Sequence, residues 1–391
     1  MMKSNVQTIF DMTQDKKYIP ELRFPEFDDD GGWDIMPISD NIITVTPPKK
    51  MPSSEYKTHG SFPIIDQSTK FIAGYSYDET ALINLEQSDY VVFGDHTCTL
   101  KLINFPFIQG ADGIKVFKSK GTLLSTRYLY QYLVAHPIHS NEYKRHFSDL
   151  KEMQIIYPHS IEEQKKIAEC LSSLDAYINA TKLKVDQLKE HKKGLMQRLF
   201  PAKDKTTPEL RFPEFQNNGE WIPRPLSDIL NYEQPTPYIV EDDTYKKEGT
   251  PVLTANKGFI LGYTNESFGI YNKLPVIIFD DFTTDKKYVD FPFKIKSSAI
   301  KLLTLKYEER DNLRFVFECM NNIVFNEKEH KRYYISTYQH ITILVPNSLQ
   351  EQEQIMKTLT TVDKQIAEYD KKIKALELHK KGLMQQLFPK L

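Results

Sequence analysis

The chain has 391 residues, of which 40% are hydrophobic and 27% are charged, with 22 Pro and 15 Gly. This composition is that of a globular protein with room for two domains, and it excludes collagen-like, low-complexity and disordered chains. A net charge of -2 means that the chain as a whole lacks the basic excess typical of nucleic-acid-binding proteins. Only three cysteines, no N-terminal signal segment and no apolar stretch long enough for a membrane span predict a cytoplasmic protein.

The chain contains two copies of one framework. Pro20–Phe27 (PELRFPEF) recurs as Pro208–Phe215, and His191–Gln197 (HKKGLMQ) recurs as His379–Gln385, each 188 residues further on. Two identities of this length at one offset indicate an internal repeat. We therefore predict five segments in chain order: a leader 1–19, a first globular domain 20–159, a first long helix 160–201, a second globular domain 202–347 and a second long helix 348–391.

The globular domains are predicted to mix helices and strands. Their variable parts, 41–159 and 229–347, contain short β-branched and aromatic runs separated by Pro, Gly, Asn and Asp, which is the pattern of strands joined by loops. The clearest strands are Asp89–Phe93, Gly113–Phe117, Leu274–Phe279 and His340–Val345, and the clearest helices are Leu123–Ala135 and Asn312–Ile323. Each domain is therefore expected to be an α+β globule.

Each globular domain is followed by a predicted helix of about 40 residues, roughly 60 Å long. Both helices begin with a capping box, in which a Ser hydroxyl binds a first-turn N–H and a Glu carboxylate reaches back: Ser160 with Glu163, and Ser348 with Glu351. Apolar residues then recur alternately every four and three positions, as in a coiled-coil seam: Ile167, Leu171, Leu174, Ile178, Val185, Leu188 and Leu195, then Ile355, Leu359, Val362, Ile366, Ile373, Leu376 and Leu383. One Lys occupies the same seam position in each copy, Lys192 and Lys380, and the helices are predicted to end before Pro201 and Pro389.

The two apolar stripes are too long to be buried separately in two small domains. We expect the helices to pair with each other, and to run antiparallel because each must return the chain to a globular domain. The predicted fold class is α+β, with two globular α/β domains separated by two long antiparallel coiled-coil helices and a pseudo-two-fold internal repeat at an offset of 188.

Sequence motifs for catalysis and for metal binding are absent. There is neither a GxGxxG after a predicted strand nor a GxxxxGK[ST]. Thr46–Lys49 (TPPK) lacks the amide and the aromatic residue of an amino-methyltransferase motif, and Asp280–Asp281 has no matching acidic cluster in the other copy. Pro137 breaks the helix that would bring His136 and His139 to one metal ion. We predict no catalytic residue and no metal site.

Two domains that share a framework and differ in their loops suit a ligand with two different sites along its length, and DNA is the natural candidate. The case depends on local clusters, because the variable parts are not basic as a whole. In these clusters, cations that can bind phosphate accompany the amides, hydroxyls and Arg side chains that base edges require. The predicted DNA-binding residues are Lys49, Lys50, Lys57, His59, Gln67, Ser68, Lys70, Lys144 and Arg145, then Lys246, Lys247, Asn256, Lys257, Lys286, Lys287, Lys331, Arg332 and Tyr333. For any single cluster, a solvated surface loop is the alternative.

Essentially the whole chain resembles the specificity subunit of type I restriction-modification systems. The resemblance is carried by the PELRFPEF segment followed by Trp33 or Trp221, by Glu162–Ala168 (EEQKKIA), and by HKKGLMQ with a closing Leu-Phe-Pro in each copy. It implies that each globular domain is a target-recognition domain for one half of a bipartite DNA sequence, and that the paired helices set the unread gap. The second copy departs from the pattern at Gln350–Met356, which is less basic than the first.

The resemblance also implies partners. Two modification subunits would carry S-adenosylmethionine and methylate adenine, and restriction subunits would add cleavage that depends on ATP and Mg²⁺. The chain itself would bind no cofactor and would not be an enzyme alone. The complex would act on double-stranded DNA in the cytoplasm of a bacterium or archaeon.

Two alternatives stay open at this stage. One is a non-catalytic coiled-coil scaffold without a role in DNA binding, which gives no reason for domains alike in framework and different in loops. The other is a stand-alone DNA methyltransferase or nuclease, which needs a cofactor-binding or catalytic segment that the sequence does not offer.

Overall fold

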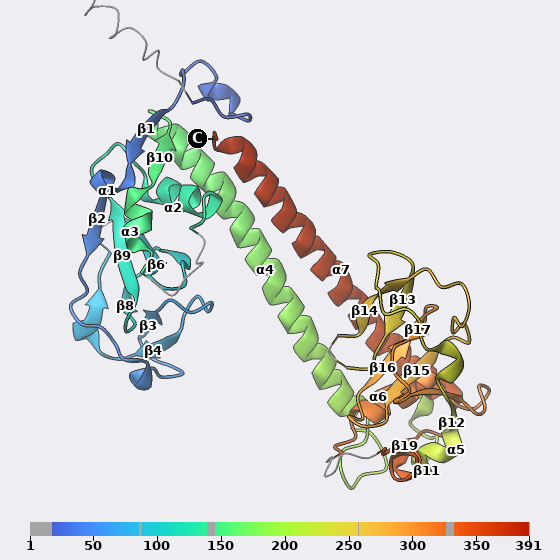
Figure 1. Ribbon diagram of the computed structural model, residues 1–391. Helices are drawn as coiled ribbons and strands as arrows, with labels where there is room; N and C mark the ends of the chain where they lie inside the picture. The colour runs from blue at the N-terminus through green and yellow to red at the C-terminus, as the bar shows by residue number, and fades with distance from the viewer. Residues whose placement is uncertain (1–17, 86–87, 139–144, 257, 326–331, 391) are drawn as a thin grey trace, which may run out of the picture. The chain divides into compact units, whose positions relative to one another are not determined.

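The computed structural model describes residues 18–85, 88–138, 145–256, 258–325 and 332–390. The chain forms two compact units: unit 1 is Met1–Leu183 with Asp370–Leu391, and unit 2 is Lys184–Tyr369 (Figure 1). The division passes through the middle of both long helices, so each unit holds one half of each. This differs from the prediction that the helices form segments of their own, because apolar side chains of both helices belong to the cores of the globular domains.

Unit 1 contains two four-stranded sheets and a separate strand pair. Its elements are β1 (Asp34–Pro37), α1 (Ile38–Asn41), β2 (Ile42–Val45), β3 (Phe62–Ile65), β4 (Gly74–Ser76), β5 (Leu82–Ile83), β6 (Tyr90–Gly94), β7 (Leu100–Ile103), β8 (Phe107–Gln109), β9 (Ile114–Ser119), α2 (Thr126–Ala135), α3 (Phe147–Glu152), β10 (Gln154–Tyr157) and α4 (Ile161–Leu199), whose second half enters unit 2. One sheet is antiparallel in the order β2-β9-β6-β7, and its inner strand β6 is buried throughout because its run of Tyr, Val, Val and Phe is apolar. The other sheet has the order β4-β3-β8-β5, and β1 pairs with β10.

Unit 2 repeats this architecture, except that its second sheet has three strands in place of four. Its elements are β11 (Ile222–Pro225), α5 (Leu226–Ile229), β12 (Leu230–Glu233), β13 (Thr250–Leu253), β14 (Ile260–Thr264), β15 (Val276–Asp280), β16 (Lys286–Val289), β17 (Lys294–Ile295), β18 (Ile300–Leu305), α6 (Leu313–Asn321), β19 (Thr342–Val345) and α7 (Leu349–Leu387), whose second half enters unit 1. The order β12-β18-β15-β16 matches β2-β9-β6-β7 strand for strand, and β11 pairs with β19 as β1 does with β10.

The elements that the sequence marked most clearly are confirmed, with small shifts at their ends: Asp89–Phe93 is β6, Gly113–Phe117 is β9, Leu274–Phe279 is β15, His340–Val345 is β19, Leu123–Ala135 is α2 and Asn312–Ile323 is α6. The sequence did not mark β5 or β17, which have two residues each. Strands this short form because a neighbouring strand pairs with them. A run of two residues is too short to show the alternation of apolar and polar residues that marks a strand in a sequence.

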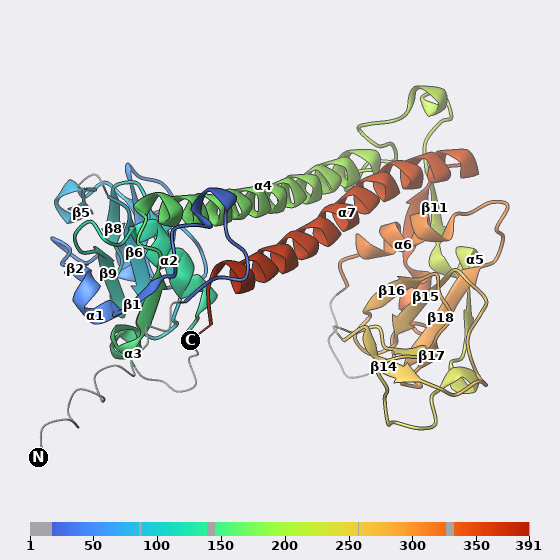
Figure 2. The ribbon, with the colours of Figure 1, turned by 90° about the horizontal axis from the view of Figure 1, so that it is seen from above.

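One helix in each unit connects the antiparallel sheet to the long helices. In unit 1, α2 contributes Tyr128 and Tyr132 to a core that also contains Phe93 of the sheet, Leu171 of α4 and Leu387 of α7. Figure 2 shows α2 beside α4. The equivalent core of unit 2 is formed by α6 with the sheet, α4 and α7. Both long helices therefore pack on each globular core through a shared layer of apolar side chains.

The long helices pair antiparallel within each unit. In unit 1, Lys182 of α4 contacts Glu377 of α7 at 2.7 Å, and Asp175, one heptad earlier in α4, contacts Lys380 further along α7. Of the predicted seam residues, the structure buries Ile167, Leu171, Ile178, Val185, Leu188, Ile355, Leu359, Val362 and Ile373. Leu174, Leu195, Ile366, Leu376 and Leu383 are half-buried. The helices end two residues before Pro201 and Pro389, as predicted.

The two lysines of the seam form matching ion pairs. Lys380 donates to both carboxylate oxygens of Asp175, at 2.6 and 2.7 Å, inside unit 1. Lys192 donates to Asp363 at 2.9 Å inside unit 2. Both lysines and both aspartates are equivalent positions of the repeat, so each copy provides the cation of one pair and the anion of the other. This reciprocity is the pseudo-two-fold relation of the two copies, seen at the level of single side chains.

A bidentate Arg–Glu pair joins each PELRFPEF segment to the start of a long helix. The Arg23 guanidinium donates from Nε and Nη2 to the two carboxylate oxygens of Glu163, at 2.8 Å each. Arg211 donates in the same way to Glu351, again at 2.8 Å each. Both glutamates are almost completely buried. The repeated segment is therefore fixed to its helix by the strongest type of side-chain ion pair.

These pairs correct part of the predicted capping boxes. The hydroxyl half is present, because Ser160 accepts the Glu163 backbone N–H at 3.2 Å and Ser348 accepts that of Glu351 at 3.3 Å. The carboxylates, however, bind arginine instead of reaching back to the backbone of the cap. An arginine offers each carboxylate two charged donors, which a single backbone amide cannot match.

Candidate nucleic-acid interface

An aspartate at the end of β6 holds three loops of unit 1 together. The Asp95 backbone N–H donates to the carbonyl of Gly113 at 2.6 Å, and its carbonyl accepts the N–H of His146 at 2.8 Å. Its carboxylate accepts the N–H of Phe147, also at 2.8 Å. Because Asp95 is buried, these bonds are shielded from water and define where the three loops lie.

The equivalent aspartate of unit 2 makes the same three contacts. The Asp281 N–H donates to Ala299 at 2.9 Å, its carbonyl accepts Tyr333 N–H at 2.8 Å, and its carboxylate accepts Tyr334 N–H at 2.7 Å. The ammonium of Lys301, itself buried, lies 3.3 Å from the second carboxylate oxygen of Asp281. Asp280–Asp281, considered in the sequence as an acidic grouping, is thus part of the loop framework.

A fourth loop joins each set. In unit 1 the hydroxyl of Thr97 donates to the carbonyl of Gln67 at 3.1 Å, and the Gln67 amide donates to the carbonyl of Asp112 at 3.4 Å. In unit 2 the hydroxyl of Thr283 donates to the side-chain oxygen of Asn256 at 3.3 Å. We call each assembly a four-loop cluster, consisting of residues 66–70, 94–99, 110–113 and 145–147 in unit 1, and of residues 254–256, 280–285, 297–299 and 332–334 in unit 2.

A buried lysine anchors the fourth loop of unit 1. Lys101 of β7 is 4% exposed, and its ammonium donates to the carbonyls of Asp66 at 2.7 Å and of Lys70 at 2.5 Å. Burial lowers the pKa of Lys101, and the nearby Asp66 carboxylate opposes this shift. Because the ammonium binds both ends of the loop 66–70, the conformation of that loop depends on a residue that does not reach the surface.

Four of the predicted DNA-binding residues of unit 1 lie in its four-loop cluster: Gln67, Ser68, Lys70 and Arg145. Two polar atoms there, Oε1 of Gln67 and Oγ of Ser68, have no hydrogen-bond partner among the described residues. Both atoms are buried, so each leaves a hydrogen-bonding capacity unmet inside the protein.

The other predicted residues of unit 1 lie on the segment before β3, which adjoins the cluster through the Met51 N–H bonded to the Gln109 carbonyl at 3.0 Å. Lys49 is already paired with Asp78 at 2.8 Å, and Lys57 lies 5.2 Å from the centre of the Tyr77 ring. Lys50 and His59 are exposed. The structure therefore places these four outside the cluster, at its border.

In unit 2 the cluster contains Asn256 and Arg332, and the Arg332 guanidinium lies 5.9 Å from the centre of the Phe282 ring. Lys286 and Lys287 follow the cluster at the start of β16. Burial lowers the pKa of Lys286, whose ammonium lies 5.8 Å from the centre of the Tyr338 ring. Lys246 and Lys247 lie on the segment before β13 and are exposed.

The predicted contact between Tyr333 and DNA is wrong. Tyr333 is 3% exposed, and its ring packs against Phe325 with 5.2 Å between ring centres. Tyr333 was predicted to contact DNA because it directly follows two basic residues. In the structure its backbone N–H donates to the Asp281 carbonyl, and its side chain is buried. Lys144, Lys257 and Lys331 lie outside the described residues. The remaining surface residues stay predictions.

The described residues contain no group of three or more His, Cys, Asp or Glu side chains that could hold a metal ion. His136 contacts the Tyr132 carbonyl, and His139 lies outside the described residues. Within the same parts of the chain, no helix combines the length and the apolar character needed to cross a membrane.

A family model described as type I restriction modification DNA specificity domain matches the chain twice, over residues 31–190 and 218–378. A curated relative, the specificity subunit of the type I restriction enzyme EcoR124I/EcoR124II from Escherichia coli, is 48% identical over 151 residues. That alignment spans 36% of this chain and only 37% of the relative.

Among solved structures, the chain is similar to the S subunit of a type-I restriction-modification system from M. genitalium. The likeness has a TM-score of 0.69 and covers 95% of this chain and 99% of that chain, at 15% sequence identity. At this identity the likeness concerns the fold alone, and it extends to both units.

Proposed function

Because the chain belongs to the family of type I restriction modification DNA specificity domains, we propose that it reads a bipartite double-stranded DNA sequence, one half with each unit. The observation that carries the proposal is the repeated four-loop cluster. Asp95 and Asp281 hold equivalent loops by the same three hydrogen bonds, whereas the side chains on those loops differ between the units. Two domains that recognise two different DNA sequences require this combination of a common loop framework and different polar side chains.

Each cluster offers the two kinds of group that such reading needs. Arg145 and Arg332 are exposed cations suited to phosphate, and they enter the clusters at equivalent positions. Gln67 and Asn256 carry the amides that pair with adenine in the major groove. We assign the reading of bases to these amides and to Ser68, and the grip on the backbone to the cations in and beside each cluster.

The two long helices connect the readers, and their length and register set the gap between the half-sites. We assign no chemical step to the chain itself. Two modification subunits supply S-adenosylmethionine and methylate adenine, and restriction subunits supply cleavage that depends on ATP and Mg²⁺. The complex acts in the cytoplasm, where the DNA is.

Substitution of two buried lysines, Lys101 in unit 1 and Lys301 in unit 2, tests whether each unit recognises its own half-site. Replacing Lys101 by Met frees the loop 66–70 of unit 1, and the complex is expected to lose discrimination in one half-site only. Each lost base contact is worth about 1–3 kcal/mol, or roughly 5- to 150-fold in discrimination. Lys301→Met releases Asp281 in unit 2 and should relax the other half-site. The measurement is the adenine-methylation sequence produced in cells with the partner subunits.

Lys120→Met, at an exposed lysine, is the control and should leave both half-sites unchanged. Thermal unfolding of each variant shows whether the fold is kept. If Lys101→Met and Lys301→Met relaxed the same half-site, or both halves equally, the assignment of one half to each unit would be wrong.

A further inference from the structure

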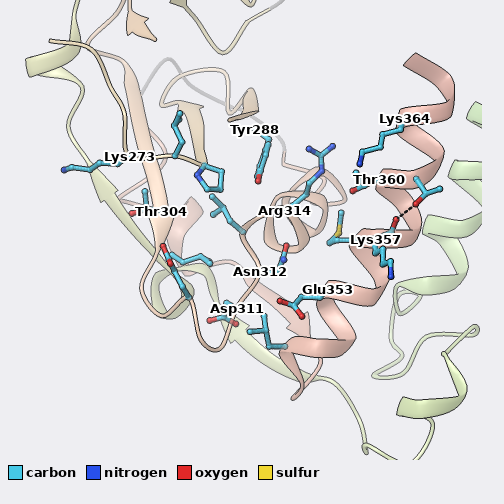
Figure 3. Close-up of a pocket in the computed structure, with 18 of the residues that line it drawn as sticks. Lys273, Tyr288, Thr304, Asp311, Asn312, Arg314, Glu353, Lys357, Thr360 and Lys364 are labelled. Carbon is cyan, nitrogen blue, oxygen red and sulfur yellow. Dashed lines mark hydrogen bonds between the residues drawn. The ribbon is translucent and has the colours of Figure 1, made fainter. Parts of the chain in front are cut away.

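Unit 2 contains an open cleft of about 1030 Å³ between α6, the end of β18, β16 and the first half of α7 (Figure 3). Its lining mixes polar and apolar side chains, and its charges are separated. Figure 3 shows Arg314 of α6 and Lys364 and Thr360 of α7 pointing toward one part of the cleft, while Asp311 and Glu353 lie at the other. The cleft therefore has a cationic end, which we define by Arg314, Lys364 and Thr360.

Arg314 is incompletely satisfied within the protein. Its guanidinium lies 4.9 Å from the centre of the Tyr288 ring, and its nearest described carboxylate is Asp363 at 3.6 Å. That carboxylate is already bound by Lys192 at 2.7 Å. The Nε–H of Arg314 is buried and has no hydrogen-bond partner among the described residues. A guanidinium in this state can still form the paired hydrogen bonds that it makes with oxyanions.

The equivalent arginine of unit 1 is satisfied. Arg127 occupies the same place in α2 that Arg314 occupies in α6, and it binds both carboxylate oxygens of Asp89, at 2.5 and 3.4 Å. Asp89 immediately precedes β6, and the residue in that place before β15 is Pro275, which lines the cleft. The second copy has therefore kept the arginine and lost the carboxylate that neutralises it.

A second difference adds positive charge at the same end. Lys364 stands where the first copy has Ala176, at the offset of 188, and no ion pair of Lys364 is found among the described residues. The acids of the cleft do not cancel this charge. Asp311 is neutralised by Arg224, at 2.5 and 3.0 Å, and Glu353 belongs to the opposite end.

We propose that the cationic end of this cleft binds a phosphate group. Arg314 provides the forked donors, Lys364 provides a second positive charge, and the Thr360 hydroxyl provides a neutral donor, which is the donor set that phosphate oxygens take in proteins. The phosphate belongs either to the DNA backbone or to a free anion such as inorganic phosphate or a nucleotide. In unit 1 the equivalent arginine is paired with Asp89, so among the residues that the structure describes we assign one such phosphate site, in unit 2.

Calorimetric titration of the full-length chain with inorganic phosphate, at constant ionic strength, tests the site directly. The native chain should bind one phosphate, and Arg314→Gln and Lys364→Gln should each weaken binding by about tenfold or more, the effect of losing ~1.4 kcal/mol. Arg127→Gln is the matched control, because it removes the equivalent guanidinium of unit 1, and it should leave phosphate binding unchanged. Absence of phosphate binding, or equal binding by Arg314→Gln, would overturn the proposal.

Binding to duplex DNA over a range of salt concentrations then identifies the source of the phosphate. If the DNA backbone supplies it, Arg314→Gln should reduce the slope of log K against log salt by about 1 without changing the sequence preferred. If the slope is unchanged while phosphate still binds, the ligand is a free anion. An effect of Arg314→Gln on modification-subunit binding, without any phosphate binding, would show that the cleft takes an acidic protein segment and would refute the phosphate site. The phosphate titration does not depend on the proposed reading of DNA, so the two proposals can fail separately.

Discussion

Replacing Glu351 by Ala is expected to lower the free energy of unfolding of unit 2 by about 3–5 kcal/mol, the cost of breaking a buried ion pair from one side. The Glu351 carboxylate is 1% exposed and accepts both donors of Arg211 at 2.8 Å. It also accepts the indole N–H of Trp221 at 3.1 Å. Without the carboxylate, a guanidinium and an indole N–H remain in the interior without an acceptor.

Thermal unfolding measures this effect, and the midpoint should fall by about 6–20 °C for a unit of this size. The matched control is Glu209→Ala, which breaks the exposed pair between Arg198 and Glu209 and should cost no more than about 1 kcal/mol. Glu163→Ala should be intermediate, because the indole nitrogen of Trp33 has no described hydrogen-bond partner and loses nothing. Equal midpoints for Glu351→Ala and Glu209→Ala would show that the Arg211–Glu351 pair does not stabilise the unit.

Reversing one charge of a seam pair should have the next largest effect. Lys380→Asp sets two carboxylates against each other in place of the pair with Asp175, whose side chains are 13% and 34% exposed. The expected loss of stability is about 2 kcal/mol, between the values for exposed and for buried pairs. Asp175→Lys in the same chain restores an ion pair with the charges exchanged, and it should recover most of the loss. Lys381→Asp, at an exposed neighbour, is the control.

The seam pairs also discriminate between registers of the two helices. Sliding α7 along α4 by one heptad in one direction sets Lys192 against Asp370 but Lys380 against Lys182. Sliding by one heptad in the other direction sets the two seam lysines against Met356 and Ala168. Only the observed register satisfies both lysines, which is the use of polar seam residues in coiled coils generally. If Lys380→Asp were as stable as the native chain, the pairs would not select the register.

The long helices could be predicted from the sequence because their signals are local. The heptad positions, the Ser caps and the closing prolines all lie within a few residues of the structure that they specify. The seam lysines Lys192 and Lys380 were visible as interruptions of the apolar stripe. Their partners were not, because Asp363 and Asp175 lie on the other helix, and an aspartate on a helix surface carries no sign of its partner.

The hydrogen bonds and ion pairs around the candidate site could not be predicted, because they join residues that are far apart in the sequence. The bond from Phe147 to Asp95 spans 52 residues, and the pair of Arg23 with Glu163 spans 140. One signal was nevertheless present: Arg23 and Glu163 both recur at the offset of 188, as Arg211 and Glu351. Charged residues of opposite sign that both recur at the offset of the repeat are candidates for mutual contact. Tyr333 shows the opposite error, since a basic run in the sequence does not reveal which neighbouring side chain turns inward.

The net charge of -2 is compatible with DNA binding because exposed cations such as Arg145 and Arg332 lie in the clusters although the chain as a whole is not basic. Buried lysines such as Lys101 and Lys301 add to the count of basic residues but act inside the protein as anchors. The net charge of the whole chain therefore neither supports nor excludes a basic ligand-binding surface.

The most direct test of the two-reader account is a domain exchange read out by genome-wide mapping of adenine methylation. Residues 41–159 are replaced by the equivalent region of a relative that directs methylation to a different sequence, and the remaining chain and the partner subunits are kept. The account predicts a bipartite methylated sequence in which one half changes while the other half and the gap stay the same. A change in both halves, or methylation of one continuous sequence, would contradict it.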